Sequence, residues 1–108
     1  MPQLIFKGVE KEDIKSLSKE MATKLAEVID CPRDYFTFEI VNTEFVFDGE
    51  EVKAYPFVQI NWFDRGQEVQ DETAKVVYEM LKTKGYNDVD IFFTVLEEVK
   101  YYENGKHF

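Results

Sequence analysis

Residues that form disulfides or bind metals are almost absent from this sequence. Among its 108 residues, Cys31 is the only cysteine and His107 is the only histidine. A single cysteine cannot form a disulfide within the chain, so we expect a reducing compartment, the cytoplasm. Metal sites usually combine several histidine or cysteine ligands. We therefore expect no metal and no other cofactor.

Long apolar runs and positive charge are also scarce. No apolar run approaches the ~20 residues of a membrane-spanning helix, and no apolar segment of the secretory type follows the start, so we expect neither a membrane span nor a leader. The formal net charge is −9, from 22 acidic and 13 basic residues. Such a surface repels phosphate backbones and anionic lipids. We therefore expect neither nucleic acid nor a membrane among the partners.

Apolar and aromatic side chains, by contrast, are abundant. Hydrophobic residues make up 44% of the chain and aromatic residues 16%. This is enough material for a packed core and excludes a disordered chain. A chain of 12.8 kDa fits one domain, which we expect to cover residues 1–108.

Two stretches have the apolar spacing of amphipathic helices. The first runs from Lys11 to Asp30, and Pro32 is expected to end it, because proline disfavours helical geometry at the residue before it. The second runs from about Gln67 to Lys84, with Gly85 as a left-handed cap. The apolar stripe of the first helix comprises Ile14, Leu17, Met21, Leu25, Val28 and Ile29.

Strands are expected before, between and after these helices. They comprise residues 3–6, 36–41, 57–63 and 90–96, with a short edge strand at 44–47 that ends in the Asp48-Gly49 turn. The tail, residues 101–108, carries a second turn signal at Asn104-Gly105. The order predicts an α+β fold, in which two β-α-β repeats form a four-stranded mixed sheet. Both helices should lie on one face of this sheet, because such crossovers are right-handed.

The strands place apolar residues at positions that point to both faces of the sheet. In the strand at 57–63, for example, Phe57 and Phe63 alternate with Val58, Ile60 and Trp62. An apolar face that no helix covers needs another cover. A second copy of the chain is the interpretation we favour. The alternative is that the hairpin and the tail fold over the sheet.

Pro2 is the first candidate for catalysis. If Met1 is removed, Pro2 becomes a secondary amine of fixed geometry. Burial and a nearby cation would both lower the pKa of that amine, because both disfavour its charged form, and it could then act as a base. The alternative is that Pro2 is simply an early residue of the first strand.

Arg33 and Arg65 are the only arginines, and each lies beside the end of an expected strand. Arginine grips carboxylates through two parallel hydrogen bonds, so both positions suit a carboxylate ligand. Arg65 also precedes a helix N-terminus, which attracts anions. The alternative is an ion pair with Asp34, Asp64 or another acid. Asp90 interrupts an apolar strand; it is either a functional acid or a solvent-facing acid at the start of that strand.

These features together resemble the tautomerase superfamily, which includes 4-oxalocrotonate tautomerase and macrophage migration inhibitory factor. The resemblance is closest to a small bacterial family of unassigned function within it. It covers nearly the whole chain and rests on the order and spacing of its features. They are Met1-Pro2 opening into a strand, two β-α-β halves, Pro32, Tyr35, Tyr55-Pro56, Gly66 and the tail at 102–108.

The resemblance implies a homotrimer with a pocket at the subunit boundary. It implies that Pro2 acts as a general base, moving a proton between carbon and oxygen in a small carboxylate-bearing enol or α-keto acid. Arg65 would anchor the carboxylate and Arg33 would assist it. Phe92 would form an apolar wall, and Asp90 falls where the family has a pocket tyrosine. Cys31 stands where inhibitory-factor-like members have a lysine.

Two other functions remain open on the sequence alone. One is a tautomerase-like homotrimer that is catalytically inactive and binds a ligand or a protein. The other is a ferredoxin-like regulatory domain that dimerises and binds an effector.

Overall fold

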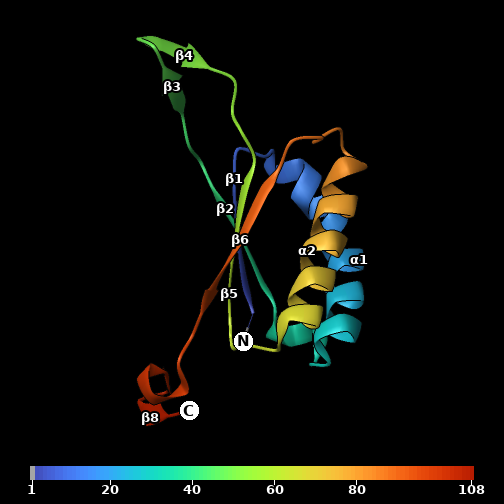
Figure 1. Ribbon diagram of the computed structural model, residues 1–108, viewed down its shortest axis with the longest axis vertical. Helices are drawn as coiled ribbons and strands as arrows, with labels where there is room; N and C mark the ends of the chain where they lie inside the picture. Colours follow the sequence, from blue (N-terminus) through green and yellow to red (C-terminus); the bar gives the residue numbers. More distant parts are fainter. Residues whose placement is uncertain (1) are drawn as a thin grey trace.

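The computed structural model describes residues 2–108 and has an α+β fold (Figure 1). Met1, whose removal the catalytic hypothesis requires, lies outside the described residues. The elements are β1 (Gln3–Lys7), α1 (Lys11–Ile29), the 3-10 turn η1 (Arg33–Tyr35), β2 (Thr37–Val41), β3 (Phe45–Phe47), β4 (Glu50–Val52), β5 (Phe57–Trp62), α2 (Gln67–Lys82), β6 (Asp90–Val95), the 3-10 turn η2 (Glu98–Lys100), β7 (Tyr102–Glu103) and β8 (Lys106–His107).

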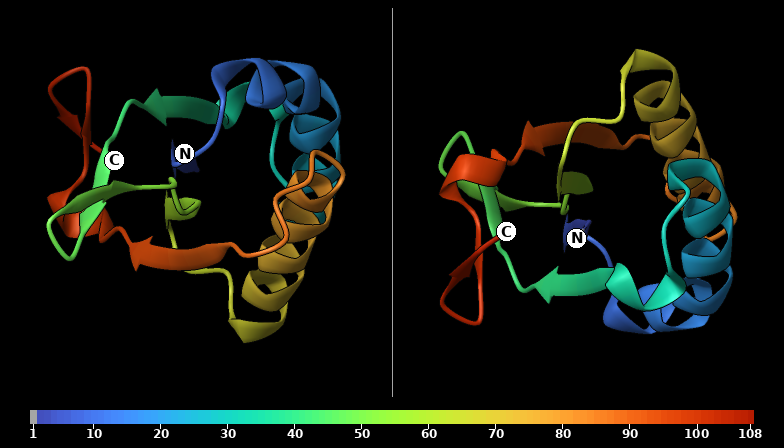
Figure 2. Two further views of the ribbon diagram at one scale, coloured as in Figure 1. Left: turned by 90° about the horizontal axis from the view of Figure 1, so that it is seen from above. Right: turned by 90° about the horizontal axis from the view of Figure 1, so that it is seen from below.

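The central sheet has four strands in the order β2-β1-β5-β6. The pairs β1–β2 and β5–β6 are parallel, whereas β1 and β5 are antiparallel. One helix connects the two strands of each parallel pair, which confirms the two β-α-β repeats and the mixed sheet. Figure 2 shows both helices on the same face of the sheet, as the handedness argument predicts.

Both helices end slightly before the predicted residues. In α1, Asp30 already adopts a left-handed backbone with φ 61°, and the amide of Cys31 donates to the carbonyl of Ala26 at 3.1 Å. The chain therefore turns away before Pro32. In α2, Gly85 has φ 90°, as expected, and the amide of Tyr86 donates to the carbonyl of Leu81 at 3.3 Å.

The core lies between the helices and one face of the sheet. The stripe predicted for α1 is buried apart from Val28, which is half-buried. Alternate strand residues meet it, and the fully buried ones are Leu4, Phe6, Val58, Ile60 and Trp62. Trp62 packs against Phe93 with ring centroids 4.8 Å apart. This packing fixes the start of β1, which Pro2 precedes, and the end of β5, where the loop to α2 begins.

The other face of the sheet is more polar than predicted, and the expectation of two apolar faces is wrong for its centre. Gln59 Nε2 donates to Asn61 Oδ1 at 2.9 Å, and Asn61 Nδ2 donates to Gln3 Oε1 at 3.2 Å. Phe57 begins the strand and Phe63 follows its last residue, so the apolar composition of this segment concealed an alternating pattern. Apolar side chains on this side of the sheet gather in two places, around Phe57 and Phe92 and around Phe63 and Phe108.

The β3–β4 hairpin and the C-terminal tail extend from opposite ends of the sheet, on the side away from the helices (Figures 1 and 2). They do not cover the middle of the open face. The hairpin turns at Asp48 and Gly49, as predicted, and exposes 73% of Val46 and 74% of Phe47. The tail is anchored by Phe108, whose ring stacks on Phe63 with centroids 5.0 Å apart.

In the described part of the chain, neither helix combines the length and the apolar character that crossing a membrane requires.

Candidate functional site

Pro2 lies at the end of the sheet where β1 begins. It is buried, and its carbonyl accepts a hydrogen bond from the amide of Thr37 at 3.2 Å. The next residue, Gln3, pairs with Thr37 on one side and with Asn61 on the other. Pro2 is therefore held between the start of β2 and the last residues of β5.

Arg65 lies at the same end, in the loop that joins β5 to α2. The side chain of Asp64 is occupied by this loop, because its Oδ1 accepts a hydrogen bond from the amide of Gly66 at 2.9 Å. Within residues 2–108, Arg65 forms no ion pair. The pair between Arg65 and Asp64 that the sequence left open is thus not formed, and the exposed guanidinium is free to meet a ligand.

Cys31 completes this end of the molecule. It is half-buried and packs against the core just after α1. Burial raises the pKa of the Cys31 thiol, while the positive charge of Arg65 works in the opposite direction. The guanidinium of Arg65 is therefore within electrostatic reach of the thiol. At neutral pH the thiol stays protonated, which suits a neutral wall better than a nucleophile.

Arg33 has a structural partner. Its Nε donates to Thr23 Oγ1 at 2.9 Å, and its Nη2 donates to the carbonyl of Lys19 at 2.8 Å. Both acceptors belong to α1, so Arg33 fastens the turn η1 to that helix. The predicted alternative, an ion pair with Asp34 or Asp64, is absent from the described residues.

Asp90 and Phe92 lie elsewhere in the same copy of the chain. Asp90 pairs with Phe57, which in turn pairs with Lys7 at the far end of β1. A strand rises about 3.3 Å per residue, so this end is about 13 Å from Gln3. Asp90 is exposed and accepts a hydrogen bond from the Tyr55 hydroxyl at 3.3 Å.

Phe92 is 47% exposed on the open face of the sheet. With Ile5 and Phe57 it lines a shallow cavity of about 440 Å³. One copy therefore has Pro2, Arg65 and Cys31 at one end of the sheet, Asp90 at the other end, and Phe92 on the open face between them.

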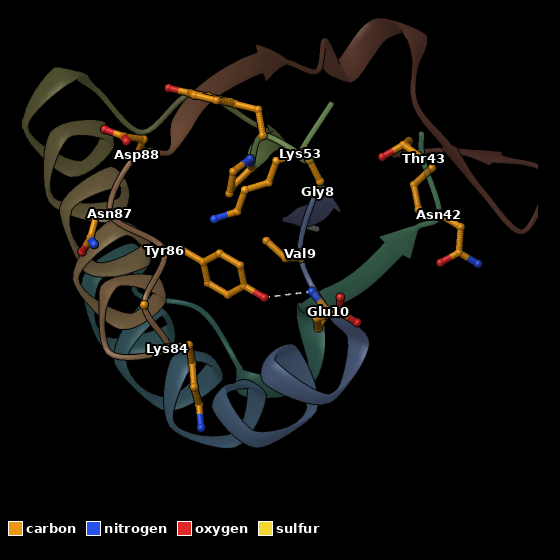
Figure 3. Close-up of a pocket in the computed structure, with 15 residues that line it drawn as sticks. Gly8, Val9, Glu10, Asn42, Thr43, Lys53, Lys84, Tyr86, Asn87 and Asp88 are labelled. Carbon is orange, nitrogen blue, oxygen red and sulfur yellow. Dashed lines mark hydrogen bonds between the residues drawn. The ribbon is translucent and has the colours of Figure 1, made fainter. Parts of the chain in front are cut away.

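A larger cavity, of about 840 Å³, lies at the end opposite Pro2 (Figure 3). Its walls are the loops that follow β1 and β2 and those that precede β5 and β6. Tyr86 fixes one wall, because its hydroxyl accepts a hydrogen bond from the amide of Glu10 at 2.9 Å and donates to the carboxylate of Asp13. Neither Tyr86 nor Lys53, a second wall residue, belongs to a sequence motif that could have pointed to this cavity.

Replacing Tyr86 by phenylalanine should lower the free energy of unfolding at pH 7 by about 1–2 kcal/mol, since two hydrogen-bonding groups lose their partner. Burial and the bond to Asp13 raise the pKa of Tyr86 above its ordinary value near 10. The contribution is therefore fully present below about pH 10 and declines as the pH rises through the folded-state value. Urea unfolding at neutral and alkaline pH measures both effects.

The matched control is Tyr35→Phe, because the Tyr35 hydroxyl has no hydrogen-bond partner among the described residues and the side chain is 41% exposed. The stability difference between the Tyr86 variant and the unmodified chain should narrow at alkaline pH. Equal losses in both variants would show that the two bonds of Tyr86 contribute nothing.

Comparison with known proteins identifies close relatives of this chain. Residues 1–107 match the family described as "Domain of unknown function (DUF1904)". A solved DUF1904 structure from Sebaldella termitidis is 40% identical, with a TM-score of 0.94 and 100% of each chain covered. A protein of unknown function from Vibrio cholerae is 31% identical, with a TM-score of 0.88 and coverage of 99% of this chain and 87% of the other. No protein with a curated description matches significantly.

More distant structures share the fold. A macrophage migration inhibitory factor-like protein from Entamoeba histolytica is 21% identical, with a TM-score of 0.75 and coverage of 99% and 98%. Fused 4-OT is 9% identical with a TM-score of 0.79, and Pt0534, solved after inactivation by 2-oxo-3-pentynoate, is 12% identical with a TM-score of 0.75. The fold these matches share is not the ferredoxin-like one, so the alternative of a ferredoxin-like regulatory domain is wrong. The chain belongs to the DUF1904 family, and its fold is that of the tautomerase superfamily.

Proposed function

We propose that this protein moves a proton between carbon and oxygen in a small enol or α-keto acid, with Pro2 as the base. The observation that carries the proposal is that a buried Pro2 and an exposed Arg65, which forms no ion pair within residues 2–108, lie at the same end of the sheet. Pt0534, which has the same fold, was inactivated by 2-oxo-3-pentynoate, a small α-keto acid. A similar acid would meet the guanidinium of Arg65 here.

In this mechanism Met1 is removed, and Pro2 presents a secondary amine. Burial and the charge of Arg65 both disfavour the protonated amine, so the neutral amine is available as a base. It takes the proton from the carbon next to the keto group, the resulting ammonium passes that proton to the enolate oxygen, and the reverse steps return the keto form. Arg65 holds the substrate carboxylate through paired hydrogen bonds.

We extend the proposal to a homotrimer. Val46 and Phe47 on the hairpin and Tyr102 on the tail are largely exposed in a single copy, and both outer strands, β2 and β6, keep a free edge. Such features favour pairing with further copies. In this assembly Phe92 and Asp90 of one copy would line the Pro2 site of a neighbour, since Asp90 lies at the far end of its own sheet and Phe92 is exposed on the open face.

Arg33 has a smaller part in this scheme. Two of its five N–H groups are engaged by Lys19 and Thr23 on α1, so only the others are available for the predicted role as an auxiliary to Arg65. In the described arrangement it supports the turn before β2 instead. Its auxiliary role in binding stays a prediction.

Replacing Arg65 by glutamine should raise KM for an enolised α-keto acid by about tenfold or more, because a charge-assisted hydrogen bond contributes roughly 1.5–3 kcal/mol. The effect on kcat should be smaller, since the carboxylate is held both before and during proton transfer. The decrease of enol absorbance measures both constants.

Lys75→Gln is the control. This substitution also removes one positive charge, but Lys75 is exposed on α2 and does not belong to the site. A KM that changes equally in both variants would show only an effect of net charge. Such a result would remove Arg65 from the proposed site.

The second candidate function is binding without catalysis, and the cavity of about 840 Å³ far from Pro2 favours it. In that case the chain keeps the trimer but recognises a ligand or a protein. Mass spectrometry of the amino terminus from native cells separates the two functions. A retained Met1 leaves Pro2 without a free amine and favours binding, whereas a chain that begins at Pro2 favours catalysis.

A further inference from the structure

The cavity at the far end of the sheet is separate from the Pro2 site. It opens beyond the last residues of β1, whereas Pro2 precedes the first. Its shape is fixed by local contacts. A Cβ atom at Gly8 would lie 2.2 Å from the carbonyl oxygen of Tyr55, so the two loops touch through their backbones. Tyr78 holds the opposite loop by donating to the carbonyl of Asn87 at 2.9 Å.

The acidic groups around this cavity are occupied or turned away. Tyr86 donates to Asp13, and Tyr55 donates to Asp90. In Figure 3 the carboxylates of Glu10 and Asp88 point away from the centre of the cavity. These carboxylates keep their negative charge, but within residues 2–108 none of them forms an ion pair with Lys53.

Lys53 is the cation that faces the cavity. Its side chain runs from the loop before β5 toward the side where Tyr86 lies, whereas Lys84 points outward (Figure 3). Within residues 2–108, Lys53 forms no ion pair. An ammonium group without a carboxylate partner, beside occupied acids, is arranged to receive an anion from outside.

One part of the wall is apolar. Pro56 is buried, and Val9 and Tyr86 pack against the core from the cavity side. Their surfaces can cover an apolar or aromatic group, and burial of such a group contributes about 25 cal/mol per Å². A ligand that satisfies both parts of the wall carries its charge at one end only.

We propose that this cavity binds a small organic acid, with its single carboxylate on Lys53 and its apolar or aromatic part against Val9, Pro56 and Tyr86. The site belongs to the loops at one end of the sheet and needs no group from the Pro2 end. It therefore stands independently of the proposed catalysis, and either one can fail without the other.

The test is a titration of the ¹⁵N-labelled full chain with 3-phenylpropanoate, followed through its amide resonances. We expect shifts at Gly8, Gly85 and Tyr86 and none around Gln3 and Arg65. The neutral isostere 3-phenylpropanamide should bind about tenfold more weakly, because it forms no charge-assisted bond. Acetate, which has the charge without the ring, should also bind more weakly.

Lys53→Met should weaken 3-phenylpropanoate binding about tenfold, because it removes the ammonium and keeps the length of the side chain. Lys75→Met on α2 should leave the affinity unchanged, and both substitutions lie at exposed positions that the fold does not depend on. Equal binding of the acid and the amide, an unaffected Lys53 variant, or shifts confined to Gln3 and Arg65 would overturn the proposal.

Discussion

Replacing Pro2 by alanine should lower kcat/KM for an enolised α-keto acid by about 100-fold or more, in a chain that begins at residue 2. The variant retains an amine, but it loses the ring that fixes the direction of that amine between β2 and β5. Positioning of this kind contributes several kcal/mol to catalysis. Stopped-flow measurement of the enol absorbance, with both chains released from the same cleavable fusion, determines the two rates.

A chain that retains Met1 provides the second arm of this experiment. The nitrogen of Pro2 is then part of a peptide bond and has no basic lone pair, so the rate should fall to the solution background. Pro32→Ala serves as the control. It also replaces a proline by alanine, but Pro32 follows α1, so the amino terminus stays unchanged. Equal rates for the unmodified chain and Pro2→Ala would remove Pro2 from the mechanism.

Replacing Gly8 by alanine should lower the free energy of unfolding by about 3 kcal/mol or more. Gly8 has φ 75°, and a Cβ atom there would meet the carbonyl oxygen of Tyr55 at 2.2 Å and the nitrogen of Pro56 at 3.0 Å. These atoms belong to the backbone, so they cannot move aside as a flexible side chain would. The loss should appear as a lower urea midpoint at a fixed protein concentration.

Gly49→Ala separates the two causes of this effect. Gly49 has φ 79°, but no atom lies within 4 Å of its added Cβ. Its substitution therefore carries only the left-handed strain, about 1–2 kcal/mol. If both alanine variants lose the same stability, the contact between the loop after β1 and the loop before β5 is looser than the structure shows. The cavity wall would then be looser as well.

Much of the fold follows from local sequence patterns. The stripe from Ile14 to Ile29 has helical spacing, and α1 buries it. Asp48-Gly49 is a turn signal that requires no distant information, and a hairpin forms there. The polar character of the open face was harder to predict. Gln59 and Asn61 alternate with apolar residues, and the flanking Phe57 and Phe63 gave the whole segment an apolar composition.

The site was only partly predictable for a different reason. Pro2 precedes β1 and Arg65 follows β5, and because these two strands are antiparallel neighbours, both residues lie at the same end of the sheet. The partners of Arg33 on α1 and of Tyr86 on Asp13 depend on side-chain directions across the fold. Residues 13 and 86 share no motif or periodicity, and no local pattern in one sequence predicts such a pair.

The proposed Pro2 site and the proposed ligand cavity lie at opposite ends of the same strand, β1. Pro2 precedes it, and Gly8 and Val9 follow it at the wall of the cavity. The strand between them is paired on both sides, so neither end can shift without changing the register of the sheet. We therefore expect the Lys53 variant to leave enol turnover unchanged and the Pro2 variant to leave 3-phenylpropanoate binding unchanged.

The most direct test of a reactive Pro2 amine is the position at which 2-oxo-3-pentynoate attaches to a chain that begins at residue 2. The neutral amine should add to the activated triple bond, forming a carbon–nitrogen bond while a proton moves to the adjacent carbon. Intact mass and peptide mapping should find one adduct, on Pro2. It should form more slowly in Arg65→Gln and at an unchanged rate in Cys31→Ser. A chain labelled only at Cys31, or unlabelled at Pro2 under the same conditions, would contradict the proposed role of the amino terminus.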